Sequence, residues 1–181
     1  MKGKWEIILA GSGGQGLGLA GQIFAEAAML ETNCLAAHNQ SFGGRARGGA
    51  SQSSLILSCE EILYPIVTCP DLLIALTQQA YLEYQPQVSD TGIIVYDSSQ
   101  VKDLKNRVRE VGFPFLISAL EMGNSKGITL MAIGAANELL KIVSPHYFHQ
   151  ALELHFSNKL LELNKEAFDR GHSLVTDKPH D

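Results

Sequence analysis

The stretch KWEIILAGSGGQG, from Lys4 to Gly16, decides the fold. Residues 4–10 are mostly apolar without alternation, which is typical of a parallel strand that is buried on both faces. Gly11, Gly13 and Gly16 then match the pattern Gly-x-Gly-x-x-Gly. A helical pattern follows, with apolar residues three and four positions apart, namely Ala20, Ile23, Ala27 and Leu30. The stretch therefore predicts a strand, a tight glycine turn and a helix in succession.

Strand and helix patterns alternate along the rest of the chain. We expect strands at residues 33–37, 51–58, 72–76, 93–97 and 113–117, and helices at 78–88, 101–111, 128–139 and 157–169, the last stopped by Gly171. Ser144 and Pro145 predict one more helix start, because serine suits the N-cap and proline the first helical position. This order predicts an α/β fold with a single doubly wound, mostly parallel, Rossmann-like sheet flanked by helices. Functional loops of such sheets lie beyond the carboxyl ends of the strands.

Length and composition indicate one ordinary globular domain. The chain has 181 residues, of which 45% are hydrophobic and 18% charged, with a formal net charge of −5. This charge disfavours non-specific binding to nucleic acid. No apolar run approaches the ~20 residues of a membrane span, and the N-terminal apolar run is too short for a signal peptide. We therefore expect a soluble, cytoplasmic protein with no membrane or nucleic-acid partner.

The cysteine content argues against a metal cluster held by this chain. The three cysteines are Cys34, Cys59 and Cys69, and no two of them form a Cys-x-x-Cys pair. Because the number of cysteines is odd and no close pair is present, we expect no disulfide framework. We expect the cysteines to act as small buried hydrophobic side chains. A four-thiolate iron–sulfur site cannot be built from three cysteines. If the protein takes part in electron transfer, another chain must hold the metal.

The glycine turn is the first candidate binding element, and it comprises Gly11, Gly13, Gly14, Gln15 and Gly16. Glycines permit a close backbone approach, and the following helix start offers unpaired N–H groups to an anion. Nicotinamide binding also requires an acidic residue at the end of the second strand. That position here reads Ala-His-Asn-Gln over residues 37–40, whereas Glu31 lies at the end of the helix, before the strand. Three interpretations stay open: a phosphate-bearing ligand or polar partner loop, tight packing without a ligand, and a dinucleotide.

A second candidate element lies in the polar, glycine-rich stretch at residues 38–49, which we expect to be an extended loop. Its sequence SFGGRARGG, at residues 41–49, contains Arg45, Arg47, Gly48 and Gly49. Two guanidinium groups on a glycine-rich backbone suit a phosphate, a carboxylate or an acidic surface of another chain. A solvated loop is the alternative. The segment follows the second strand, which places it on the same sheet edge as the glycine turn.

Taken together, these segments resemble the gamma subunit, or gamma domain, of the 2-oxoacid:ferredoxin oxidoreductases. The resemblance rests on Gly-x-Gly-Gly-Gln-Gly after the first strand, Ala-Arg-Gly-Gly before the third, Pro-Asp before an apolar strand, an apolar helix with Gly134, and NKEAFDRG at residues 164–171. It implies a gamma-type domain over residues 1–171, followed by a polar tail at 172–181. These pieces run in order from Lys4 to Gly171, which is nearly the whole chain.

The resemblance implies membership of a multi-subunit enzyme. Family members convert a 2-oxoacid and coenzyme A into an acyl-CoA, carbon dioxide and reduced ferredoxin, with thiamine diphosphate, magnesium and iron–sulfur clusters. These groups are expected on partner chains, namely thiamine diphosphate-binding alpha and beta subunits and a ferredoxin-like delta subunit. This chain lacks the Gly-Asp-Gly and distant Asn pattern that holds magnesium diphosphate. We expect it to hold no cofactor alone and to have no complete activity alone.

The implied role is architectural, with coenzyme A contact at a subunit interface. As a hypothesis, Arg45 and Arg47 contact phosphate groups or the alpha chain, and the glycine turn, residues 11–16, lines the same interface. No residue is identified as catalytic, because His38 and His146 have no nucleophile or carboxylate at a recognisable spacing. A chain separated from its partners would expose its interfaces and could self-associate.

The oxoacid and the rival functions remain open at this point. On general appearance, a 2-oxoglutarate or branched-chain enzyme is favoured over a pyruvate enzyme. Rivals are the small subunit of an indolepyruvate:ferredoxin oxidoreductase, a free-standing dinucleotide-binding protein and a non-enzymatic anion-binding module. Partner chains would identify the first, a bound cofactor the second, and a stable monomer with phosphate affinity the third.

Overall fold

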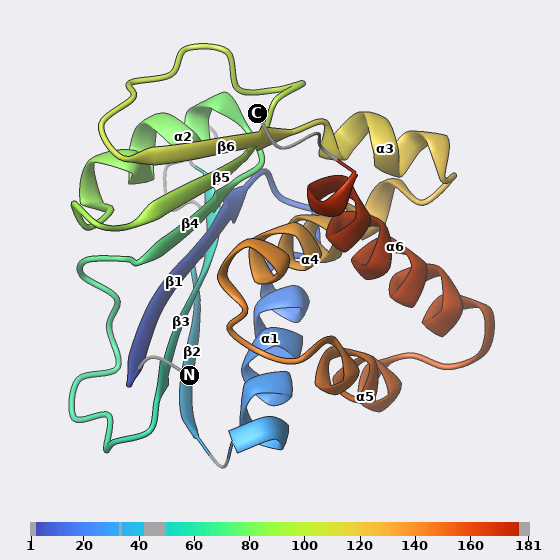
Figure 1. The fold of residues 1–181 in the computed structure, drawn as a ribbon, viewed down its shortest axis with the longest axis horizontal. Coiled ribbons are helices and arrows are strands. Elements are labelled where there is room, and N and C mark those ends of the chain that lie inside the picture. The colour runs from blue at the N-terminus through green and yellow to red at the C-terminus, as the bar shows by residue number, and fades with distance from the viewer. Residues whose placement is uncertain (1–2, 33, 42–49, 178–181) are drawn as a thin grey trace.

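The computed structural model describes residues 3–32, 34–41 and 50–177 (Figure 1). Its elements run, in chain order, β1 Lys4–Gly11, α1 Leu17–Thr32, β2 Leu35–Ser41, β3 Ser51–Ser58, β4 Leu72–Ala75, α2 Gln78–Tyr84, η1 Gln85–Gln87, β5 Ile93–Asp97, β6 Arg109–Phe113, α3 Phe115–Glu121, η2 Ser125–Gly127, α4 Ile128–Leu140, α5 Pro145–His155 and α6 Asn158–Thr176. The expected α/β alternation is confirmed.

The described strands form one six-stranded sheet in the order β2-β3-β1-β4-β5-β6. The pairings β1–β4, β4–β5 and β5–β6 are parallel, whereas β3 runs antiparallel to both β1 and β2. The expected mostly parallel sheet is thus confirmed, with β3 as the antiparallel member. Because β3 is antiparallel to both of its neighbours, β2 runs in the same direction as β1. The carboxyl ends of β1 and β2 therefore lie at the same end of the sheet.

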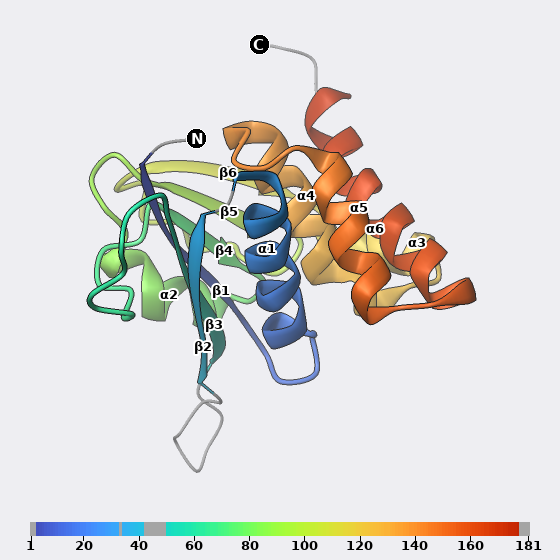
Figure 2. The same ribbon diagram turned by 90° about the horizontal axis from the view of Figure 1, so that it is seen from below.

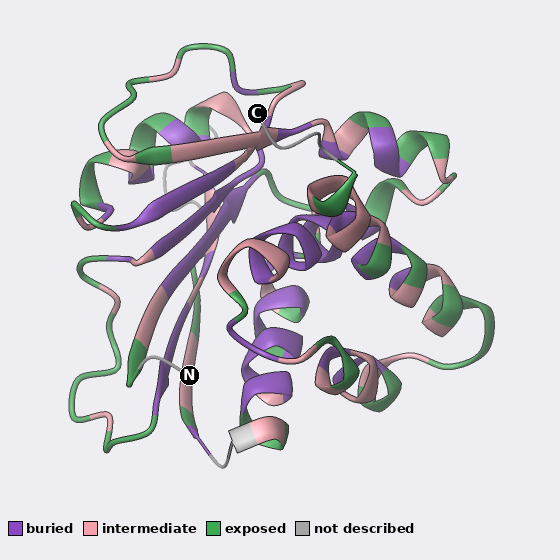
Figure 3. Cartoon of the chain, in the orientation of Figure 1, coloured by how far each residue is buried: buried purple, intermediate pink, exposed green. Residues whose placement is uncertain are grey.

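Helices cover both faces of the sheet (Figure 2). On one face α1 and α4 pack against the strands, and α5 and α6 form an outer layer that packs on α1 and α4. The other face packs against α2, which buries Tyr81 and Tyr84. The central strands β1, β3, β4 and β5 are mostly buried in Figure 3, whereas the outer strands β2 and β6 are mostly half-buried or exposed. From β1 the chain passes through α1 toward β2, whereas from β4 it passes through α2 toward β5. The strand order therefore switches direction between β1 and β4, and in open α/β sheets ligands commonly bind beyond the carboxyl ends of the strands at such a point.

The expected end of the last helix before Gly171 is wrong, because α6 continues to Thr176. Gly171 lies where α6 crosses α4, and a Cβ there would stand 1.8 Å from the Met131 carbonyl oxygen. Gly134 of α4 is similarly close to α6, 2.1 Å from the Phe168 carbonyl oxygen when given a Cβ. The glycine therefore serves a close helix crossing and does not end the helix. The expected polar tail is helical as far as Thr176, and residues 178–181 lie outside the described part.

The helix expected at residues 101–111 is also wrong. Residues 101–108 form an irregular connection, and β6 follows, parallel to β5. Side chains of α2 accept the backbone hydrogen bonds of this connection: Lys102 N donates to Gln78 Oε1 (2.7 Å) and Lys105 N to Tyr81 Oη (2.7 Å). The backbone donors are satisfied without a helix, so the helical pattern is overridden by tertiary contacts.

The strand expected at residues 113–117 is displaced for a related reason. Only Phe113 belongs to β6, and α3 begins at Phe115, after Pro114. Buried Asp97 at the end of β5 accepts a hydrogen bond from Leu116 N at 2.8 Å and so caps the first turn of α3. This agrees with the capping role that is common for an aspartate at a strand end.

The second strand is longer than expected, which corrects the start of the loop. β2 runs over Leu35–Ser41, and His38 to Ser41 pair with Leu55 to Gln52 of β3. Residues 38–41 are therefore strand, not loop. Arg45, Arg47, Gly48 and Gly49 lie in the 42–49 segment, which is outside the described residues.

Candidate functional site

The glycine turn joins β1 to α1, as the sequence predicts. Gly11 is the last residue of β1, and Gly16 accepts the first helical hydrogen bond of α1, from Ala20 N at 3.0 Å. Gly14 and Gly16 have φ angles of +88° and +73°, which side chains other than glycine adopt only with strain. The turn therefore depends on glycine at these two positions.

The Gln15 side chain folds back over the turn. Its Oε1 accepts a hydrogen bond from Ser12 N at 2.8 Å. A Cβ on Gly11 would stand 2.1 Å from the same oxygen, so the glycine there makes room for the amide. The Gln15 side chain thus accepts the hydrogen bond of the Ser12 N–H. The same N–H could equally donate to an oxygen atom of a ligand.

A hollow of about 340 Å³ lies beside the turn, on the side of β2 and β3. It is lined by residues 12–19 together with Gln40, Ser51 and Gln52. None of these lining side chains ionises near neutral pH. The start of α1 opens on this hollow, and its first-turn N–H groups lack intrahelical acceptors, which gives the hollow a positive bias. The site can bind and orient an anion but has no acid–base group among these residues.

The described residues on either side of the 42–49 segment lie at this edge. Ser51, the first residue of β3, pairs with Gly11 of β1, and Ser41 at the end of β2 pairs with Gln52. Gln40, Ser51 and Gln52 line the hollow. The segment with Arg45 and Arg47 lies outside the described residues, so its expected place beside the glycine turn stays a prediction.

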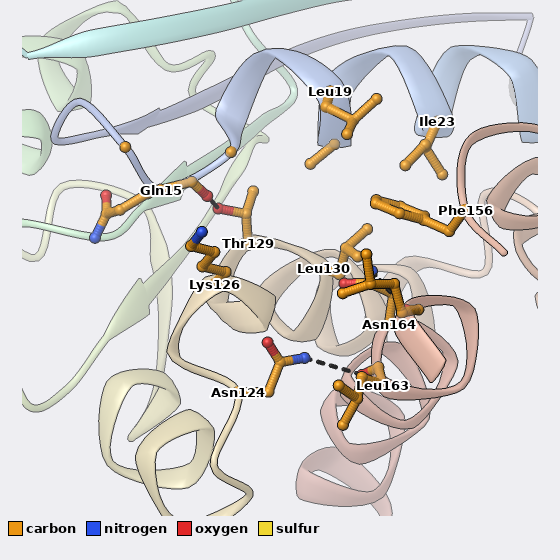
Figure 4. Close-up of a pocket in the computed structure, with 14 residues that line it drawn as sticks. Gln15, Leu19, Ile23, Asn124, Lys126, Thr129, Leu130, Phe156, Leu163 and Asn164 are labelled. Carbon is orange, nitrogen blue, oxygen red and sulfur yellow. Dashed lines mark hydrogen bonds between the residues drawn. The ribbon is translucent and has the colours of Figure 1, made fainter. Parts of the chain in front are cut away.

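A second hollow, of about 300 Å³, lies on the other side of the glycine turn (Figure 4). Its wall is mostly apolar, with Leu19 and Ile23 of α1 facing Leu130, Phe156 and the α6 side chains Leu160 and Leu163. Gly14, Gln15 and Gly16 line both hollows. The turn is therefore a partition between a polar and an apolar space.

One cation stands at the apolar hollow. Lys126 of η2 lines it, and in Figure 4 its side chain extends toward Thr129 and Gln15. The Thr129 hydroxyl donates to the Gln15 carbonyl oxygen at 2.6 Å. Lys126 and Thr129 were not predicted from the sequence, because they lie more than 100 residues after the glycine motif and are not part of any recognisable motif.

Two further glycines, which were also not predicted from the sequence, allow α1 to pack closely against β2 and β3. A Cβ at Gly18 would meet the Gln40 side chain at 2.3 Å, and one at Gly21 would meet Ser53 Oγ at 2.1 Å. His38 Nε2 contacts Ser53 Oγ at 2.8 Å beneath this crossing. Burial lowers the pKa of His38, and nearby Glu26 only partly opposes that shift. His38 is thus a packing residue, satisfied by a hydroxyl.

The described residues of this edge lack the features that a nicotinamide site needs. β2 ends in Asn39, Gln40 and Ser41, and β3 separates it from β1. Glu31 is already engaged, since its Oε2 accepts a hydrogen bond from Ser144 N at 3.0 Å. No carboxylate is therefore placed at the end of β2 to hold ribose hydroxyls.

The described part of the chain contains neither a metal-binding cluster nor a membrane-spanning helix. No three His, Cys, Asp or Glu residues there gather closely enough to hold a metal ion. Likewise, none of the helices in residues 3–32, 34–41 and 50–177 has the length and apolarity to cross a membrane.

Comparison with known proteins gives consistent matches. The model of the pyruvate ferredoxin/flavodoxin oxidoreductase family matches residues 6–174. The 2-oxoglutarate synthase subunit KorC of Methanocaldococcus jannaschii is 35% identical over 179 residues, covering 97% of this chain and 96% of the relative. The ketoisovalerate oxidoreductase subunit VorA of Methanothermobacter thermautotrophicus is 31% identical over 91% of this chain, but the match covers only 35% of that protein.

Solved structures share the fold. The gamma subunit of a keto/oxoacid ferredoxin oxidoreductase from Geobacter sulfurreducens superposes with a TM-score of 0.87 and 33% identity, over 96% of this chain and 97% of that one. A 2-oxoglutarate:ferredoxin oxidoreductase from Magnetococcus marinus gives a TM-score of 0.85 at 23% identity, over 100% of this chain and 32% of that one. At that identity, the second match bears on the fold alone.

Proposed function

The chain belongs to the pyruvate ferredoxin/flavodoxin oxidoreductase family, as a gamma-type subunit of a 2-oxoacid:ferredoxin oxidoreductase, and we propose that its enzyme acts on 2-oxoglutarate. The main support is the end-to-end correspondence with the KorC subunit of Methanocaldococcus jannaschii, at 97% and 96% coverage. The VorA match, in contrast, covers about a third of a longer chain. The proposed reaction converts 2-oxoglutarate and coenzyme A into succinyl-CoA and carbon dioxide, and ferredoxin takes the electrons.

The proposed partners carry the chemistry. Thiamine diphosphate-binding alpha and beta subunits would form the covalent intermediate with magnesium, and a ferredoxin-like delta subunit would carry the electrons. This chain would contribute binding and orientation, which agrees with a polar hollow whose described lining side chains are all uncharged. Its expected place in the cytoplasm belongs to the same proposal.

At the subunit interface, the glycine turn and the arginine segment would contact the phosphate groups of coenzyme A. Three features support this fit. The α1 start faces the polar hollow, Ser12 N already donates to an amide oxygen that a phosphate oxygen could replace, and Arg45 and Arg47 follow Ser41 closely in the sequence. The alternative occupant of this edge is an acidic surface of the alpha subunit.

The substrate is tested on the enzyme purified with its partner chains. Coenzyme A-dependent reduction of ferredoxin would be measured with 2-oxoglutarate, 2-oxoisovalerate, pyruvate and indolepyruvate. The proposal predicts the highest kcat/KM for 2-oxoglutarate. A higher value for any of the other three acids would contradict it.

The binding role is tested by replacing Arg45 and Arg47 with Ala in the assembled enzyme. The KM for coenzyme A should rise about ten-fold or more, because each charge-assisted hydrogen bond contributes roughly 1.5–3 kcal/mol. Arg109→Ala is the matched control, since Arg109 begins β6 at the opposite edge of the sheet. Unchanged assembly together with an unchanged KM for coenzyme A would show that the segment has neither role.

A further inference from the structure

Two cysteines lie opposite each other beside the start of β2 and the end of β3, at the end of the sheet that is far from the glycine turn. Leu35 of β2 pairs with Ser58 of β3, so the residues one step outside this pair, Cys34 and Cys59, continue the same antiparallel register. Their Sγ atoms are 3.2 Å apart. Sequence spacing did not predict this contact, because 25 residues separate the two cysteines along the chain.

The backbone geometry at this pair suits a cross-strand bond. Cys59 N donates to the Gly3 carbonyl oxygen at 3.1 Å, so it points toward β1 and away from β2. In an antiparallel ladder the N–H and C=O of one residue face the same neighbour. Cys34 and Cys59 are therefore a non-hydrogen-bonded pair, for which Cα atoms are about 4.5 Å apart. That separation is within the range that a disulfide spans.

The two thiols differ in access. Cys34 is 4% exposed, whereas Cys59 is exposed at the surface. Cys59 can therefore meet an oxidant from solution, and Cys34 is positioned to complete the reaction behind it. The hydrogen bond with Cys34 raises the pKa of Cys59, so the thiolate is scarce at neutral pH and the first step is slow.

We propose that Cys34 and Cys59 are a redox-convertible pair that forms an intrachain disulfide by exchange with a small-molecule disulfide. The Cys59 thiolate attacks the disulfide of oxidised glutathione, which releases one glutathione and leaves a mixed disulfide on Cys59. The Cys34 thiolate then attacks Cys59 Sγ and releases the second glutathione. Two protein thiols are oxidised and one glutathione disulfide is reduced to two thiols, with both protons passing to glutathione.

The bond would fasten the start of β2 to the end of β3. β2 is an edge strand of the described sheet, and β3 is its neighbour. The opposite ends of the same two strands carry Gln40 and Ser51, which line the polar hollow. The disulfide would therefore secure the edge hairpin at the end away from the candidate site.

The test is a peptide map of the full-length chain after exposure to oxidised glutathione, with remaining thiols alkylated under denaturing conditions. Trypsin cuts after Arg45 and Arg47, and a glutamate-specific protease cuts after Glu31, Glu60 and Glu61. Cys34, Cys59 and Cys69 then lie on separate peptides. The proposal predicts that peptides 32–45 and 48–60 are linked, two hydrogens lighter than their sum, and are separated again by dithiothreitol.

Two variants make the result specific. Cys69→Ser should form the same link at the same rate, and Cys34→Ser should accumulate glutathione on Cys59 because the second thiol is missing. Glutathione that persists on Cys59 of the unchanged chain while Cys34 is alkylated would overturn the proposal. So would alkylation of both Cys34 and Cys59 in the unchanged chain after an incubation long enough for the Cys34→Ser chain to accumulate glutathione on Cys59.

Discussion

The Thr129 hydroxyl donates a 2.6 Å hydrogen bond to the carbonyl oxygen of Gln15, and so fastens the glycine turn to the first turn of α4. Thr129 is 1% exposed, so water does not compete for the contact. α4 in turn crosses α6 closely at Gly134 and Gly171. The candidate binding edge near the N-terminal end of the chain is therefore held in place by α4 and α6.

Removing this hydroxyl should loosen the turn. Thr129→Val keeps the side-chain volume but loses the donor, and we expect a loss of about 1 kcal/mol in the free energy of unfolding. Urea unfolding measures it. Thr129→Ser retains the hydroxyl and should recover most of the loss. A larger loss for Thr129→Ser than for Thr129→Val would mean that the methyl group, not the hydrogen bond, stabilises this position.

The glycine turn should tolerate alanine at one position and not at the next. Gly14 has a φ of +88°, so Gly14→Ala should cost about 1–2 kcal/mol through backbone strain, although no atom lies within 4 Å of the new Cβ. Gly13→Ala is the matched control, because its nearest contact is Ser51 Oγ at 3.9 Å. Thermal unfolding compares them, and equal melting temperatures would contradict the strained conformation.

The crossing of α4 and α6 should leave no room for a side chain at Gly171. In Gly171→Ala the new Cβ would stand 1.8 Å from the Met131 carbonyl oxygen, which only a backbone movement can relieve. We expect destabilisation of about 3 kcal/mol in urea unfolding. Gly3→Ala, with nothing within 4 Å of its Cβ, should change little. A Gly171→Ala chain as stable as the Gly3→Ala chain would contradict the crossing.

Acidification should weaken the fold through His38. Burial lowers the pKa of His38 in the folded chain, whereas the unfolded chain keeps a value near 6.5. As the pH falls below this value, the unfolded chain binds a proton that the folded chain resists, so stability decreases until the folded pKa is passed. His38→Gln should therefore flatten the pH dependence of the free energy of unfolding over this window.

Ser53→Ala is the control for that experiment, because it removes the hydrogen-bond partner of His38 but leaves the titrating ring in place. Its free energy of unfolding should still fall with decreasing pH. If His38→Gln follows the same pH curve as the unchanged chain, His38 is not the group responsible.

The sequence predicts those parts of the fold whose cause is local. β1, the glycine turn and α1 follow from an apolar run, glycines and helical spacing that all lie within a few residues of one another. β3 and β5 are found at their expected residues for the same reason. The antiparallel direction of β3 was not predicted, because the alternation of strand and helix patterns indicated parallel crossovers throughout.

Features that depend on distant contacts could not be predicted in this way. Residues 101–108 have a helical pattern, yet Gln78 and Tyr81 of α2 satisfy their backbone donors outside a helix. A glycine near the end of a helical pattern indicates a helix stop. Gly171 is instead required for the close approach of α6 to the Met131 carbonyl oxygen on another helix. Within the candidate site, the glycine turn was predicted, whereas Thr129 and Lys126 become visible only when α4 is placed against it.

As the gamma subunit of a larger oxidoreductase, this chain should co-purify with its partner chains. The measurement is an anaerobic affinity purification of the chain from its native cell, with the co-eluting chains identified by mass. We expect stoichiometric recovery of thiamine diphosphate-binding partners and a cysteine-rich ferredoxin-like chain. Recovery of the chain alone, with or without a bound nucleotide, would contradict it.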